Sequence, residues 1–227
     1  MHIYGGLKNY KSPEDIPGVA TKSDGDATAI VVVAGSETGW DSGYEPIPRA
    51  LANTMAESII RASDTQFAAE VTQSIDAARE LLKSEFGHLA DDVGAPSAMS
   101  ASVRIANGSM MAGTVGNIVV VLIGATSVRL TSPHVLGEQM EAPGVDEALL
   151  ETPTSIIAAD LAPSPRFAGP WPTNLGDRIV IASLRAIGWH NMRGSFEGWR
   201  TCSAQGLADR LRERKHSRFY PFAIVDI

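Results

Sequence analysis

The residues best placed to do chemistry stand at the end of an apolar run. Residues 29–39 read AIVVVAGSETG, a β-branched stretch that stops at a loop containing glycine. Such a stretch predicts a buried strand leading into a tight turn at a sheet edge, where a metal ligand or a catalytic acid often stands. The strand ends here on Ala34 and Gly35, which can neither bind a metal nor transfer a proton through a side chain. The strand resembles one that supports an active site, but it lacks the acid.

Acidic residues do occur on both sides of this strand. Glu14 and Asp15 form an adjacent pair before it, and Glu37, Asp41 and Glu45 follow it in the segment SETGWDSGYE. Carboxylates are the ligands that hard divalent cations prefer. They are equally common in solvated surface loops. The sequence leaves both interpretations open.

Other catalytic patterns are weaker. The candidates for a hydrolase triad are Ser36, Ser42, Ser183, His134 and His190, but no Gly-x-Ser-x-Gly elbow is present and no spacing links a serine to a histidine. The sequence contains no phosphate-binding P-loop, no dinucleotide fingerprint and no Cys-x-x-Cys pair for zinc. Cys202 is the only cysteine, which excludes an internal disulfide and fits a reducing compartment.

Composition and charge exclude several classes of protein. The 227 residues are 44% hydrophobic, which is enough for one domain, residues 1–227, with a full core. The net charge of -7 argues against non-specific nucleic-acid binding, because that binding needs Lys and Arg to neutralise phosphates. No apolar stretch reaches the roughly 20 residues of a membrane span, and the N-terminus does not read as a secretory signal. We therefore expect a cytoplasmic protein that binds neither nucleic acid nor membrane.

Hydrophobic periodicity gives the order of the elements that would position these residues. Apolar residues recur at helical spacing over 47–59 and over 67–82, which predicts two successive amphipathic helices. Extended runs follow, and the Asn-Gly pair at 107–108 predicts a type I′ hairpin turn. Residues from about 139 to 174 are first acidic and then rich in proline, which predicts an irregular excursion. The segments DRIVIAS and YPFAIVDI predict two buried strands with an amphipathic helix between them.

This order predicts an α+β fold rather than a parallel βαβ fold. The helices are grouped between sets of antiparallel strands, and every apolar face is used if two sheets pack together with helices on both outer sides. The expected architecture is a four-layer α-β-β-α sandwich of two antiparallel sheets flanked by helices.

With these elements in place, the chain resembles the protein phosphatase 2C family of metal-dependent Ser/Thr phosphatases, nearly end to end. The family opens with a segment ending in Glu-Asp and a strand ending in Asp-Gly, and paired helices and a hairpin follow. Its later motifs are Gly-Asp-Ser-Arg, Leu-Thr-x-Asp-His, a strand ending in Ser-Asp-Gly, and Asp-Asn before a closing strand. The corresponding segments here are GLKNYKSPED, AIVVVAGSETG, MAGTVGNIVVVLI, RLTSPH, GDRIVIASLRAIG and SRFYPFAIVDI. The resemblance implies the four-layer fold.

The resemblance also implies which residues correspond to the family's site, where acids hold two divalent metals that orient a water nucleophile. The corresponding positions are Glu14, Asp15, Ala34, Gly35, Asn117, Leu184, Arg185 and Arg218. Of these only Glu14 and Asp15 are acidic, and the resemblance implies that family aspartates fall on Ala34, Asn117, Leu184 and, approximately, Arg218. At an effective dielectric of ~20, one misplaced unit charge ~4 Å away costs about 4 kcal/mol. We therefore expect no bound metal, no cofactor and no catalytic residue.

The resulting hypothesis is a pseudophosphatase, a regulatory or adaptor module that binds a protein partner such as a kinase or a phosphoprotein. The alternative is an active Mn²⁺- or Mg²⁺-dependent Ser/Thr phosphatase whose ligands are Glu14, Asp15, Glu37 or Asp41. A third hypothesis is a metal-free enzyme acting on a small molecule, with Arg185 or Arg218 lining the cleft. Metal binding separates the second hypothesis from the other two.

Overall fold

The computed structural model describes residues 2–6, 16–35, 46–87, 97–138, 145–161, 163–188, 196–213 and 221–227. The elements in chain order are β1 (His2–Gly6), β2 (Val19–Asp24), β3 (Ala27–Gly35), α1 (Pro46–Ile59), α2 (Phe67–Phe86), β4 (Ser97–Ala106), β5 (Ser109–Val115), β6 (Ile118–Ile123), β7 (Val128–Leu130), η3 (Leu136–Glu138), α4 (Glu147–Leu150), β8 (Ile157–Ala158), β9 (Arg166–Pro172), β10 (Arg178–Ser183), α5 (Leu184–Ile187), α7 (Glu197–Thr201), α8 (Ala204–Glu213) and β11 (Phe222–Asp226). Within the described residues, no helix is long and apolar enough to cross a membrane.

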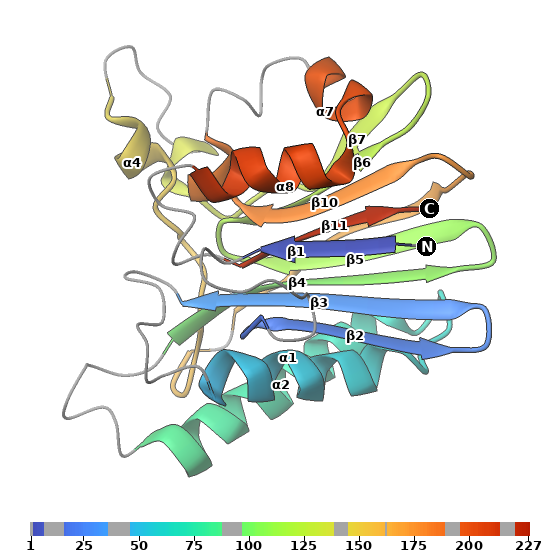
Figure 1. Cartoon of the computed structure of the whole chain (residues 1–227). Coiled ribbons are helices and arrows are strands. Elements are labelled where there is room, and N and C mark those ends of the chain that lie inside the picture. The colour runs from blue at the N-terminus through green and yellow to red at the C-terminus, as the bar shows by residue number, and fades with distance from the viewer. Residues whose placement is uncertain are drawn as a thin grey trace.

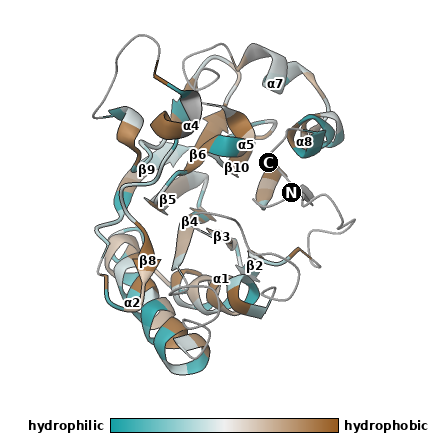
Figure 2. Ribbon diagram, turned by 90° about the vertical axis from the view of Figure 1, so that its left-hand side faces the viewer, coloured by the Kyte–Doolittle hydropathy of each residue, from teal (hydrophilic) through white to brown (hydrophobic). Residues whose placement is uncertain are grey.

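The strands form two antiparallel sheets. Sheet A has the order β1-β11-β10-β6-β7, and sheet B has the order β2-β3-β4-β5-β9, with β8 also paired to β4. Helices α1 and α2 cover the outer side of sheet B, and α8 lies on the outer side of sheet A (Figure 1). The view along the layers places α4, α5 and α7 on the same side as α8 (Figure 2). The predicted four-layer α-β-β-α sandwich is confirmed.

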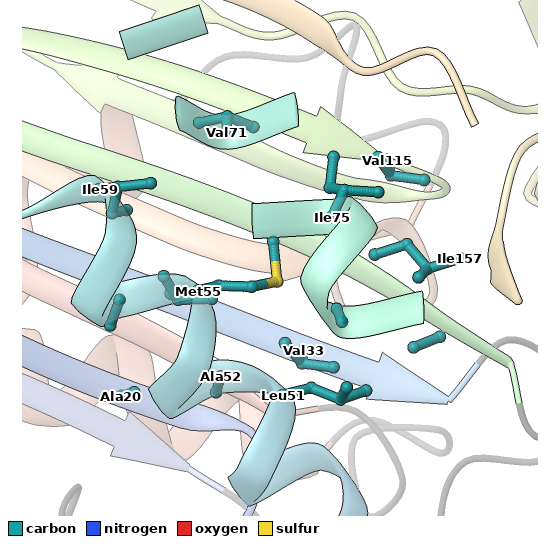
Figure 3. Close-up of a cluster of buried hydrophobic side chains, with 14 of the residues drawn as sticks. Ala20, Val33, Leu51, Ala52, Met55, Ile59, Val71, Ile75, Val115 and Ile157 are labelled. Carbon is teal, nitrogen blue, oxygen red and sulfur yellow. The ribbon is translucent and has the colours of Figure 1, made fainter. Parts of the chain in front are cut away.

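Strand β3 is continuously apolar because both of its faces are buried. Ile30, Val32 and Ala34 face the core between the two sheets. Val31 and Val33 face the helices. Figure 3 shows Leu51 and Met55 of α1 on this outer side, and Met55 is fully buried there. A strand between a sheet and a helical layer needs no polar side chain, which explains the unbroken run in the sequence.

The Asn-Gly pair forms the predicted hairpin. Asn107 and Gly108 have φ values of 52° and 67°, and the flanking strands β4 and β5 pair directly from Ala106 and Ser109. A type I′ turn needs positive φ at both central residues, which Asn and Gly tolerate best.

The region from 139 to 174 is more ordered than the sequence predicts. Its described part contains α4, β8 and β9, and β9 pairs with β5 as an outer strand of sheet B. The prediction of an irregular excursion is wrong for this strand. Pro170 and Pro172 suggested a loop, but an edge strand tolerates proline because one of its sides has no ladder to donate to.

An arginine of β10 ties the end of helix α7 to sheet A. Arg178 donates from Nε to Asp226 Oδ1 at 2.6 Å and from Nη2 to Oδ2 at 3.1 Å. Its Nη1 donates to the carbonyls of Trp199 at 2.8 Å and Cys202 at 2.7 Å. The hydrogen bond to Asp226 is the main cause that raises the pKa of Arg178. One guanidinium therefore satisfies a carboxylate and two backbone carbonyls.

Replacing this arginine is expected to destabilise the fold far more than replacing a surface cation. We expect Arg178→Met to lower the free energy of unfolding by about 2–3 kcal/mol, because one carboxylate and two backbone carbonyls, all partly buried, lose a charged donor. The matched control is Lys22→Met, since Lys22 pairs with Glu57 at 3.3 Å between exposed side chains. That control is expected to cost less than about 0.5 kcal/mol. Equal costs in urea denaturation would contradict the structural role of Arg178.

Candidate functional site

The described candidate positions lie together at one end of the sandwich. Strand β3 ends beside the start of β4, where Ala34 pairs with Met99. The neighbouring strand β5 ends beside the same part of β4, and the turn Gly116–Asn117 then crosses from sheet B to sheet A. The first residue of β6, Ile118, pairs with Ser183, the last residue of β10. The topology therefore brings the ends of β3, β5 and β10 to one place, as the resemblance implies.

Ala34 faces the interior at this end. It is fully buried in the core between the sheets, together with Met99 and Ile118. The backbone N–H of Asn117 donates to Met99 Sδ at 3.5 Å, so the methionine lies between the end of β3 and the β5–β6 turn. Gly35, the last residue of β3, is also buried. The position at which an acid was expected is thus filled by close apolar packing.

Leu184 faces the opposite side of sheet A. It is fully buried with Leu207 of α8 and Phe222 of β11. Its neighbour Arg185 is half-buried, and its backbone amide donates to Ser183 Oγ at 3.2 Å. The end of β10 thus leads directly into the short helix α5, and the side chain of Ser183 caps the N-terminus of that helix.

The polar centre of this end is Asn117, which is fully buried and hydrogen-bonded to two other segments of the chain. Its Oδ1 accepts from Ser183 Oγ at 3.0 Å, and its Nδ2 donates to the carbonyl of Glu151 at 3.1 Å. Its own carbonyl accepts from the amide of Leu184 at 2.8 Å. These bonds hold the side-chain amide within the protein, so it has a clear structural role.

Ser183, one of the triad candidates, bonds to Asn117 and Arg185 in this arrangement and to no histidine among the described residues. The hydroxyl of Ser183 donates to Asn117 and accepts from the amide of Arg185. His134 is also buried, and its Nδ1 has no hydrogen-bond partner in the described part of the chain. Burial, and then the charge of Arg166, lowers the pKa of His134, while Glu138 opposes the shift. The other triad candidates, Ser36, Ser42 and His190, lie outside the described residues.

Several other candidates also lie outside the described residues, namely Glu14, Asp15, Glu37, Asp41, Glu45 and Arg218. Among the residues that are described, no group of three or more His, Cys, Asp or Glu side chains is arranged to hold a metal ion. Ala34 and Leu184 have no side-chain donor, and both polar atoms of the Asn117 amide are engaged. A divalent cation needs several oxygen ligands, so these three positions do not fit one.

Solved structures with the same fold span nearly the whole chain. A serine/threonine phosphatase from S. agalactiae matches with a TM-score of 0.74 and 15% identity over 100% of both chains. The PPM Ser-Thr phosphatase MsPP from Mycobacterium smegmatis, solved with cacodylate, matches with a TM-score of 0.66 and 13% identity over 100% of this chain and 98% of that chain. This chain has the fold of the PPM Ser/Thr phosphatases. No family model and no curated protein matches its sequence.

A regulatory protein also has this PPM fold. PppA from Pseudomonas aeruginosa, described as a key regulatory component of its T6SS, matches with a TM-score of 0.66 and 10% identity over 98% of this chain and 94% of that chain. At 10–15% identity such likenesses establish the PPM fold alone, so chemistry must be argued from the residues.

The family resemblance picked out Asn117 as a site position, but the sequence did not indicate which groups its side chain bonds to. The signal that was present is the replacement of an acid by its amide, which keeps the size and a hydrogen-bonding oxygen but adds a donor. The use of that donor could not be read from the sequence, because its acceptor is the backbone carbonyl of Glu151. A backbone carbonyl is the same for every residue type.

Proposed function

We propose that this PPM-fold protein is a pseudophosphatase, a regulatory or adaptor module that binds a protein partner and does not hydrolyse phosphoesters. The observation that carries the proposal is the burial of Ala34 and Leu184, both 0% exposed at the strand ends where the family resemblance expects metal-binding acids. A side chain buried in an apolar cluster offers no ligand and leaves no room for a hydrated cation.

The chemistry of PPM phosphatases, as the resemblance implies it, depends on acids that hold two metals and a nucleophilic water. Mg²⁺ keeps near-octahedral oxygen coordination and usually retains several waters, which requires an open, hydrated site. The end of the sandwich carries instead a methionine between Ala34 and Asn117, and a side-chain amide whose oxygen and nitrogen are both hydrogen-bonded to protein groups. These features favour a scaffold role over catalysis.

The exposed surface supports the partner-binding half of the proposal. In the described part of the chain, the large apolar side chains that are exposed all fall between β7 and the loop after β9, namely Val128, Leu130, Leu149, Leu161, Phe167 and Leu175. Exposed apolar and aromatic side chains are of the kind that protein interfaces use. We take a kinase or a phosphoprotein as the first candidates for the partner.

The proposal is tested by calorimetric titration of metal-free protein with Mn²⁺, followed by a phosphopeptide hydrolysis assay in the same buffer. We expect neither a sub-millimolar isotherm nor turnover above the rate without protein. The S. agalactiae phosphatase, measured in parallel, is the positive control. Saturable binding with turnover would overturn the proposal and would favour an active enzyme whose ligands come from Glu14, Asp15, Glu37 or Asp41.

A further inference from the structure

Two short stretches lie side by side at the same end of the sandwich as Asn117. Residues 133–138 and 150–154 run antiparallel, with a bridge between Val135 and Pro153. The amide of Leu136 donates to the carbonyl of Thr152 at 3.0 Å, and the amide of Thr154 donates to the carbonyl of His134 at 2.8 Å. We call this pair of stretches the strap.

The strap is held to the β5–β6 turn by hydrogen bonds, and its apolar side chains pack beside sheet A. The amide of His134 donates to the carbonyl of Gly116 at 2.8 Å, and Asn117 Nδ2 donates to the carbonyl of Glu151 at 3.1 Å. Val135 and Leu150 add apolar contacts in the cluster that contains Leu184. An unfavourable charge introduced among these contacts favours local opening of the strap.

His134 stands at the centre of this attachment. It is 8% exposed, and its Nδ1 is buried with no acceptor or donor opposite it in the described structure. Arg166 of β9 donates from Nη1 to the carbonyl of Pro133 at 2.7 Å and is paired with Glu138 of η3. Glu151 in the second stretch is also buried, but the charges that act on the imidazole are those of Arg166 and Glu138.

We propose that His134 is a proton-operated latch: mild acidification charges its imidazole and releases the strap from the β5–β6 turn. Protonation would place an N–H at Nδ1 where no acceptor is available, beside a guanidinium of the same sign. A buried cation without a partner is unfavourable, so the charged form prefers the opened strap, where water reaches the ring. The proposal does not depend on whether the protein is a pseudophosphatase.

The direction of the pH dependence follows from linkage. The pKa of His134 is lowered in the closed state, mainly by burial and then by Arg166, while a solvated histidine titrates near 6.5. The open state therefore binds more protons below about pH 6.5, and closure loses stability as the pH falls through that value. At neutral pH and above, the strap keeps its full attachment.

The test is hydrogen exchange of the strap amides of Leu136 and Thr154 between pH 7.5 and pH 5.5, expressed as protection factors that remove the intrinsic pH dependence. We expect protection to fall by up to about tenfold per pH unit below about 6.5. Amides in the centre of β10 serve as the internal control and should keep their protection. In His134→Asn, which retains a polar side chain that does not titrate, the strap should lose its pH dependence.

A second variant keeps the proposal testable if His134→Asn does not fold. Arg166→Gln removes the like charge beside the imidazole, so the midpoint of the protection change should move to higher pH even if overall protection falls. Unchanged strap protection in the wild type across this pH range would overturn the latch. The same fall in His134→Asn as in the wild type would also overturn it, because another group would then be responsible.

Discussion

Replacing Ala34 with aspartate is expected to destabilise the protein by about 3–5 kcal/mol at neutral pH, because the new carboxylate would be an uncompensated buried charge. Ala34 is 0% exposed, among Met99, Ile118 and the other side chains of the core between the sheets. An acid placed there meets apolar groups on the interior side. Restoring the acid that the family resemblance expects should therefore damage the fold rather than restore a metal site.

The matched control for this prediction is Ala34→Asn, which has nearly the same volume and no charge. The difference in unfolding free energy between the two variants isolates the cost of the charge. Burial raises the pKa of the introduced carboxyl, so the aspartate variant loses stability as the pH rises above the unfolded value near 3.9 and regains it on acidification. Urea denaturation at several pH values between 4 and 7 measures this difference.

Urea denaturation of Ala34→Asp in the presence of Mn²⁺ distinguishes a packed, metal-free site from one that binds a cation. Because Ala34 faces a closed interior, we expect Mn²⁺ to leave the unfolding midpoint of Ala34→Asp unchanged. A midpoint that rises with the Mn²⁺ concentration would mean that the end of β3 opens to a cation, since a ligand stabilises only a state that binds it. That result would contradict the packed site and would favour the relocated-ligand phosphatase.

Much of the fold could be predicted because its signals are local or periodic. Helices α1 and α2 follow from apolar residues at helical spacing, and both bury that stripe against sheet B. The β4–β5 hairpin follows from Asn107 and Gly108, which have the positive φ values that the turn requires. The apolar run in β3 predicts burial on both faces, which the core between the sheets and the helix-facing core confirm.

The features that could not be predicted depend on pairing between distant segments. Strand β9 contains Gly169, Pro170 and Pro172, and it is a strand only because β5 offers it a ladder. The strap is likewise defined by a bridge between Val135 and Pro153 and by carbonyl groups that every sequence possesses. Local propensity cannot report such pairings, since the same residues would form a loop without their neighbours.

The candidate site, like the fold, could be predicted only in part. The resemblance placed Ala34, Asn117 and Leu184 near one another, and the topology agrees. It did not indicate that Ala34 and Leu184 face opposite sides of the sandwich, one toward the core between the sheets and the other toward α8. The two side chains therefore belong to separate apolar clusters, with Asn117 and Ser183 as the polar contact between the segments.

Replacing Gly116 with alanine is expected to lower the free energy of unfolding by about 2–5 kcal/mol, from two separable causes. Gly116 has a φ of 82°, a conformation that costs a residue with a Cβ about 1–2 kcal/mol. A Cβ at this position would also lie 2.4 Å from Met99 Cγ and 2.8 Å from its Cβ. Overpacking of this kind typically adds about 1–3 kcal/mol.

Gly176 provides a control in which an added Cβ meets only the cost of a positive φ and no clash. Its φ is 90°, and a Cβ built there would meet nothing within 4 Å. Gly176→Ala is therefore expected to cost about 1–2 kcal/mol, and the excess cost of Gly116→Ala measures the clash with Met99. If both substitutions cost the same in urea denaturation, the close contact between the turn and Met99 is not present.

The double variant Gly116→Ala with Met99→Ala identifies the source of the excess. Truncating Met99 to alanine alone should leave a cavity and cost about 2–5 kcal/mol, but in the double variant it also removes the contacts with Met99 Cγ and Sδ and leaves only the contact with its Cβ. The combined cost should therefore fall short of the sum of the single costs by about 1 kcal/mol or more. Additive costs would place the strain of Gly116→Ala in the backbone alone. A clear coupling would show that Met99 holds the β5–β6 turn, and with it Asn117 and the strap, against the end of β3.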